Sequence, residues 1–120
     1  MRKDDEIRLR HMLDAAREAV AFARGRRRGD LDNDRQLVLA LVKDVEIVGE
    51  AATQITKPTR RHLPEIPWER IVGMRNRLVH ANFDMNLDIV WKTVRGDLPV
   101  LISLLESAIP SERGSTPESE

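Results

Sequence analysis

The stretch DNDRQLVLALVKDVEIVGEAATQI, residues 32–55, decides the fold. Its larger apolar residues recur every three or four positions, at Leu37, Leu41, Val45, Val48, Ala52 and Ile55. This spacing places them on one side of a helix of about five turns. We expect Asp32 or Asn33 to cap this helix at its start and Pro58 to stop it. The stretch therefore predicts one long helix with a single buried face.

The same spacing recurs on both sides of this stretch. It predicts helices over about residues 4–24 and 86–108, and a further helix that begins near Trp68 with Pro67 in its first turn. Pro99 should kink or split the last helix, because its ring clashes with the carbonyl one turn back. The prediction is an all-α protein, an up-and-down bundle of four to five helices with a Pro-kinked or split last helix.

Length and composition indicate one domain. A chain of 120 residues can bury one core, and 41% hydrophobic with 33% charged residues is typical of a helical bundle that folds in water. We expect the helical domain to span residues 1–109. The stretch 110–120 is polar and has no large apolar side chain to anchor it, so it is expected to form a disordered tail.

Several classes of function are disfavoured by composition. The chain has no cysteine, and His11 and His62 stand alone without metal-ligand spacing, so neither a metal nor a cofactor is expected. Aromatic residues make up only 3%, too few for a base-stacking platform. The charged N-terminus does not resemble a secretory signal, and no apolar run reaches membrane-spanning length. A cytoplasmic protein without membrane contact is expected.

Charge is balanced over the whole chain but uneven along it. Twenty basic and twenty acidic residues give no general attraction for a polyanion. Six Lys or Arg residues nevertheless lie between Lys57 and His80 against two acidic residues, and a second basic cluster follows at Arg24, Arg26, Arg27 and Arg28. These are the expected contacts if a phosphate backbone binds. The alternative is that both clusters are solvated helix ends or loops.

The segment MRNRLVHANF, residues 74–83, concentrates the polar and ionisable groups. On an ideal helix Arg75 and His80 differ by about 140° in direction and about 7.5 Å in rise. They can meet on one ligand only if the helix ends near His80 or if a second copy of the chain completes the cleft. Asn76 shares a helix face with His80, so its amide could orient the imidazole.

This pair of side chains suits one reaction in particular. An imidazole can remove the proton from a ribose 2′-hydroxyl, and a guanidinium can stabilise negative charge on the attacked phosphate. Such a site needs no metal and makes RNA the natural substrate. The alternative is a capped helix end, with Arg75 exposed and His80 bonded to the backbone.

A family resemblance raises the weight of the catalytic interpretation. The stretches IVGEAA (47–52), PEIPW (64–68), IVGMRNRLVH (71–80), VW (90–91) and DLP (97–99) resemble, in order and spacing, the HepT-like branch of the HEPN superfamily. The resemblance runs from the first helix to about Ala108. The superfamily motif is an arginine, then a polar residue, then a histidine after four to six intervening positions, and Arg75, Asn76 and His80 fill these places.

The resemblance implies both an activity and partners. It implies a four- or five-helix bundle that acts as a homodimer, with two motifs lining a shared cleft where RNA is cut without a metal. The catalytic residues would be Arg75, His80 and Asn76, and we expect Arg77, Arg70 and Lys57 to bind RNA. The chain would then be the toxin of a toxin–antitoxin pair, with a small MNT-type nucleotidyltransferase as its antitoxin.

One position departs from the family pattern. Members regulated by this antitoxin carry a tyrosine two residues after the histidine, to which AMP is attached, whereas Asn82 stands there and the chain has no tyrosine. No tyrosine modification site exists in this sequence. A partner would have to mask the cleft, or another nucleophile such as Ser or Thr is used, or this member has lost its role as a toxin.

Two further hypotheses remain open from the sequence. The chain could be a catalytically silent module that occludes RNA or docks a nucleotidyltransferase, or a domain in which Arg75 and nearby basic residues hold a nucleotide. Glu50, on the long helix, is expected to pair with Arg75 or Arg77 and to position it, or to be a surface residue.

Overall fold

All regular elements in the described part of the chain are helical. The computed structural model describes residues 1–78 and 85–110. The helices are α1 (Lys3–Ala23), α2 (Asp30–Asn33), α3 (Arg35–Thr53), α4 (Lys57–His62), α5 (Trp68–Val72), α6 (Met74–Leu78), α7 (Leu87–Lys92), the π-helical turn η2 (Thr93–Asp97) and α8 (Leu98–Ala108). The predicted all-α class is confirmed. None of these helices is long and apolar enough to cross a bilayer.

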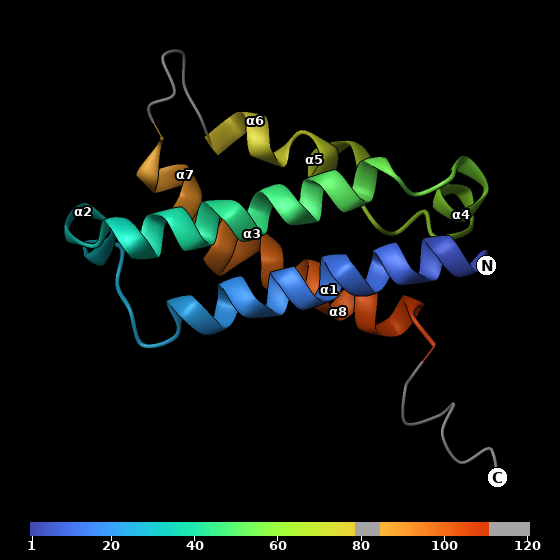
Figure 1. Cartoon of the computed structure of the whole chain (residues 1–120), viewed down its shortest axis with the longest axis horizontal. Helices are drawn as coiled ribbons and strands as arrows, with labels where there is room; N and C mark the ends of the chain where they lie inside the picture. The colour runs from blue at the N-terminus through green and yellow to red at the C-terminus, as the bar shows by residue number, and fades with distance from the viewer. Residues whose placement is uncertain (79–84, 111–120) are drawn as a thin grey trace, which may run out of the picture.

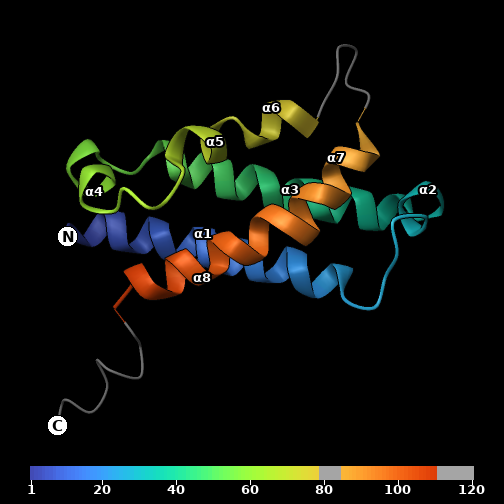
Figure 2. The same cartoon turned by 180° about the vertical axis from the view of Figure 1, so that it is seen from behind.

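The frame of the fold is an antiparallel pair of long helices. Figure 1 shows α1 and α3 running side by side in opposite directions, with α5 and α6 along α3. From behind, α7, η2 and α8 cross the pair diagonally and end against α1 (Figure 2). On α1, Ala16 and Ala19 are fully buried, and small side chains of this kind allow helices to pack closely. Leu41, Val45 and Val48 on α3 are also fully buried.

The ends of α3 differ from those predicted. The cap at its start is Asp34, whose carboxylate accepts a hydrogen bond of 3.0 Å from the Leu37 amide. Asp32 and Asn33 cannot cap α3, because they belong to the short helix α2. At the other end α3 stops at Thr53, and Pro58 lies in the first turn of α4 instead of ending α3. Both predictions were therefore wrong in detail.

The last helix is split, as predicted from Pro99. Proline has no N–H for the carbonyl one turn back, and it occupies the first turn of α8, where that donor is not needed. The preceding turn, η2, is wound as a π-helix and joins α7 to α8. Asn86 caps α7 by accepting a hydrogen bond of 3.1 Å from the Ile89 amide.

Two local features determine where α6 lies. α3 and α5 pack closely at Gly49, where an added Cβ would sit at an ordinary van der Waals distance of 3.5 Å from the carbonyl oxygen of Ile71. Gly73 then separates α5 from α6. The backbone N–H of Asn86 donates a hydrogen bond of 2.7 Å to the Leu78 carbonyl, which joins the end of α6 to the start of α7. Of the predicted tail, only Pro110 is among the described residues.

Candidate functional site

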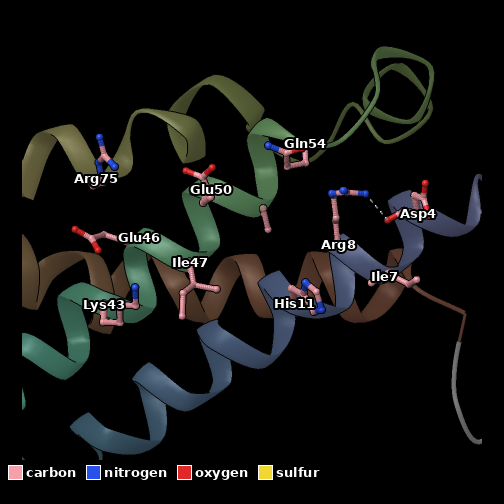
Figure 3. A pocket seen from close by; sticks show the side chains of 11 residues that line it. Asp4, Ile7, Arg8, His11, Lys43, Glu46, Ile47, Glu50, Gln54 and Arg75 are labelled. Atoms are coloured by element: carbon pink, nitrogen blue, oxygen red, sulfur yellow. Dashed lines mark hydrogen bonds between the residues drawn. The ribbon is translucent and has the colours of Figure 1, made fainter.

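Arg75 lies on one wall of a groove that runs between α1 and α3. The groove has a volume of about 600 Å³, and Figure 3 shows the side chains that line it. Arg75 extends from α6 and is exposed. The α3 wall carries Lys43, Glu46 and Glu50. A guanidinium in this position is accessible to a ligand in the groove.

The charged groups of the groove are not paired with one another. Among the described residues, no ion pair within 4.0 Å joins Arg75 or Lys43 to Glu46 or Glu50. The predicted ion pair between Glu50 and Arg75 or Arg77 is therefore absent in this part of the chain, and the surface alternative holds. Glu50 is exposed, so water can satisfy its carboxylate without a cationic partner.

Arg70 and Arg77 are engaged within the fold and do not line the groove. The guanidinium of Arg70 lies 3.3 Å from the carboxylate of Asp97 on η2. Arg77 turns back over α5, where its Nη1 donates a hydrogen bond of 3.1 Å to the Arg70 carbonyl. The Nη2 of Arg77 is buried and has no partner within the described residues. Arg77 thus bridges the break at Gly73, which connects α5 and α6.

Lys57 is exposed but lies apart from the other predicted residues. It begins α4, which Figure 1 shows at the end of the bundle near the N-terminus, with α5 between α4 and α6. The structure therefore does not bring Lys57 and Arg75 together. One RNA molecule can contact both residues only if its strand extends along α5.

The rest of the motif is described only in part. Asn76 is exposed on α6, and its backbone N–H donates a hydrogen bond of 3.1 Å to the Gly73 carbonyl. His80 and Asn82 lie outside the described residues, so the predicted meeting of Arg75 with His80 stays a prediction. The described residues include no group of three His, Asp or Glu side chains that could hold a metal ion.

The second basic cluster is largely structural. Arg26 lies 2.8 Å from Asp34, the cap of α3. Arg28 contacts Asp88 on α7 at 2.6 Å, and this hydrogen bond raises the pKa of its guanidinium. These ion pairs tie the loop after α1 to α3 and α7. To contact a phosphate backbone, Arg26 and Arg28 would have to share these partners, so the interpretation as phosphate contacts stays a prediction.

His11 lines the groove, which the sequence did not predict. We expected an isolated surface histidine, and it is indeed exposed, but α1 places it in the same groove as Arg75. Figure 3 shows it projecting from α1 across from the α3 wall. The two residues are 64 positions apart (75 minus 11), and no local pattern links them.

Comparison with known proteins defines the class to which this fold and site belong. The model of the family described as "Ribonuclease HepT-like" matches residues 12–108, which include Arg75 and the α3 wall of the groove but not the α1 residues that line it. The chain belongs to the HepT-like ribonuclease family. The predicted family and its enzyme class, ribonuclease, are thereby confirmed.

Individual relatives carry names of the same kind. A protein of Methanocaldococcus jannaschii named "Putative RNase" is 30% identical over 98 residues, which cover 82% of this chain and 90% of the relative. A "Putative RNase" of Caldanaerobacter subterraneus is 30% identical over 105 residues, or 88% and 94% of the two chains. The "Probable ribonuclease HepT" of Thermococcus cleftensis is 40% identical over 68 residues, 57% and 62% of the chains. No solved structure gives a significant match.

Proposed function

We propose that this protein is a metal-independent endoribonuclease toxin that cuts RNA through Arg75 and His80 at the cleft of a homodimer. The observation that carries the proposal is the state of Arg75. It is exposed on the wall of a groove, without an ion-pair partner among the described residues, in a chain of a ribonuclease family. A guanidinium that is not neutralised within the fold is available to a phosphate.

The reaction follows from the chemistry of the two side chains. The imidazole of His80 accepts the proton of a ribose 2′-hydroxyl, and the freed oxygen attacks the adjacent phosphorus. The bond from phosphorus to the 5′ oxygen breaks, that oxygen takes up a proton, and a 2′,3′-cyclic phosphate remains. Arg75 stabilises the charge that develops on the phosphate, and Asn76 orients the imidazole. No step requires a metal ion.

A second copy of the chain would complete the cleft. A second copy is one of the two ways in which Arg75 and His80 can meet on one ligand, the other being a helix that ends near His80, and the homodimer implied by the family resemblance favours the second copy. Of the predicted RNA contacts, Lys57 is free to bind a strand beyond the cleft, whereas Arg70 and Arg77 would have to share their present partners. The homodimer and these contacts are part of the proposal.

The partner in this scheme is an MNT-type nucleotidyltransferase antitoxin, and both proteins would act in the cytoplasm, where RNA is available. The absence of tyrosine favours inhibition by masking, because no phenolic hydroxyl can accept AMP. The same absence favours the second candidate function, a silent module that docks this partner without cutting RNA. The two functions differ in one respect: the toxin cleaves RNA, and the silent module does not.

Growth of cells that express the protein alone tests the toxin activity. Expression of the wild type should arrest growth, and expression of His80→Ala should not. His62→Ala is the matched control, since this exposed histidine lies on α4 away from the groove, and it should arrest growth like the wild type. Arrest by His80→Ala at equal protein levels would refute the proposed mechanism. Stable binding of the nucleotidyltransferase without arrest would favour the silent module.

A further inference from the structure

The groove beside Arg75 contains a set of groups that the predicted motif does not use. Arg8 and His11 extend into it from α1, three positions apart and so on one helix face. Lys43 and two carboxylates, Glu46 and Glu50, line it from α3. The groove therefore offers cations and anions within one volume of about 600 Å³, a size typical of small-ligand sites.

These groups are available to a ligand. The guanidinium of Arg8 makes one long hydrogen bond, 3.3 Å, to the backbone carbonyl of Asp4. In the described parts of the chain, Lys43, Glu46 and Glu50 form no ion pair within 4.0 Å. These cations can bind an anionic group of a ligand, and the carboxylates can accept hydrogen bonds from its donors.

An apolar surface lies between the charged groups. Ile7 on α1 is 44% exposed, and Ile47 on α3 is half-buried. Both line the groove. A nucleotide matches this combination, because it has an anionic phosphate, a base with apolar faces, and amino and imino donors on the base edge.

We infer that this groove binds the nucleotide next to the cleaved phosphate and selects guanine. The inference rests on the proposed nuclease function, which places the attacked phosphate at Arg75. Glu46 and Glu50 are four positions apart and share a face of α3. The two oxygens of a carboxylate can accept two parallel hydrogen bonds. Guanine has two neighbouring donors, N1–H and the N2 amino group, whereas the other bases have an acceptor beside the donor on that edge.

The cationic residues have a separate role in this arrangement. His11, Arg8 and Lys43 contact the phosphates that flank the selected base, while Glu46 and Glu50 contact the base itself. Loss of a phosphate contact weakens binding of every sequence alike, but loss of a base contact removes the preference. The two kinds of residue can therefore be told apart by experiment.

A second copy of the chain is the less suitable occupant of the groove. A stable protein interface buries about 800 Å² on each partner, usually around an apolar centre. Ile7 and Ile47 are the large apolar side chains of the groove, and most of its other lining residues are charged or polar. This balance favours RNA over a protein surface.

Binding of 2′-O-methyl RNA hexamers tests the inference without interference from cleavage. Hexamers that differ at one central base are compared on the wild type, on the double variant Glu46→Gln/Glu50→Gln, and on Glu69→Gln, an exposed control on α5 outside the groove. The wild type and the control should prefer guanine about tenfold, and the double variant should lose this preference. Equal affinity for all four bases in the wild type, or an unchanged preference in the double variant, would overturn the inference.

Two further measurements separate this inference from the nuclease proposal. Lys43→Ala and His11→Ala should raise the KM for cleavable RNA severalfold and leave the oligomeric state unchanged. If they instead shift the monomer–dimer equilibrium, the groove is an interface between copies and the inference is wrong. Cleavage that depends on His80 but shows no preference for guanine at the product ends would sustain the nuclease and refute the subsite. A guanine preference in binding without any cleavage would sustain the subsite and refute the nuclease.

Discussion

At the scale of single residues, two buried carboxyl groups respond to pH in opposite directions. Burial disfavours the charged form of Asp5, but hydrogen bonds from Thr56 and Thr59 outweigh it and lower its pKa. Asp44 is 2% exposed, and its Oδ2 is buried with no hydrogen-bond partner. Burial, followed by the neighbouring Glu18, raises the pKa of Asp44 to about 7. The charged Asp5 therefore stabilises the fold at neutral pH, whereas Asp44 stabilises it more at acidic pH, where its carboxyl group is protonated.

The raised pKa of Asp44 predicts a loss of stability as the pH rises from acidic to neutral. Its ordinary value of 3.8 applies to the unfolded chain, so between pH 3.8 and about 7 the folded protein holds the extra proton. The free energy of unfolding contributed by this group falls across that range and is constant above it. Asp44→Asn, which stays neutral, should be more stable than the wild type at pH 8 by an amount on the order of 1 kcal/mol.

Urea unfolding at pH 5 and pH 8 checks this prediction. The wild type should lose stability relative to Asp44→Asn at the higher pH. Asp14→Asn, a change of an exposed aspartate on α1, is the control and should show the pH dependence of the wild type. A variant Asp44→Asn with the same pH dependence as the wild type would contradict the account of this group.

Thr59 links α4 to the start of α1 through Asp5. Its hydroxyl donates a hydrogen bond of 2.5 Å to the buried carboxylate, and the hydroxyl of Thr56 donates another of 2.5 Å. Thr59→Val should lower the free energy of unfolding by about 1.5–3 kcal/mol at pH 7, because the charge loses a donor and cannot reach water. Thr53→Val, at an exposed position, should change it by less than about 0.5 kcal/mol. Equal effects of the two substitutions in urea unfolding would show that this link contributes little.

At the scale of elements, hydrophobic spacing predicted the helices that bury a face, and local hydrogen bonds decided where they begin and end. The spacing of Leu41, Val45 and Val48 located α3, and Pro99 located the split before α8. The cap at Asp34 was missed, because several residues in that stretch can accept the same hydrogen bond. The break at Gly73 was missed too, since the apolar spacing continues across it.

The sequence was enough to single out Arg75 as a motif residue, but not to predict the groove in which it lies. Arg75 stands out in a short polar segment, but His11 reaches the same groove only through the packing of α1 on α3. Long-range placement of this kind leaves no periodic signal in the chain. The roles predicted for Arg70 and Arg77 rested on charge alone, which does not show that both are bonded within the fold.

The bond from Arg77 to the α5 backbone predicts that Arg77 positions α6. Arg77→Lys keeps the charge but loses the guanidinium that reaches the Arg70 carbonyl, so α6 and Arg75 should be held less firmly. We expect kcat to fall about tenfold with little change in KM. Lys92→Ala, a change of an exposed cation on α7, should leave both constants unchanged. Full activity of Arg77→Lys would show that only the charge of Arg77 matters, as a phosphate contact requires.

At the scale of the whole molecule, the position of Arg75 depends on how the short helix α6 packs along α3. The pair α1–α3 forms the core and one groove, and the much shorter α5 and α6 lie along α3 and carry Arg75. The Leu78–Asn86 hydrogen bond joins the two ends of the segment that contains His80. The fold leaves Arg75 exposed on the wall of the groove.

The central claim is that Arg75 and His80 together cut RNA without a metal. The most direct measurement is cleavage of a fluorescent RNA by the purified protein in the presence of EDTA, with the wild type, Arg75→Ala, His80→Ala and the control Arg35→Ala, an exposed arginine at the start of α3. We predict cleavage by the wild type and the control, and at least a hundredfold loss in both motif variants. Undiminished cleavage by His80→Ala, or a wild type that is inactive until a metal is added, would contradict the account.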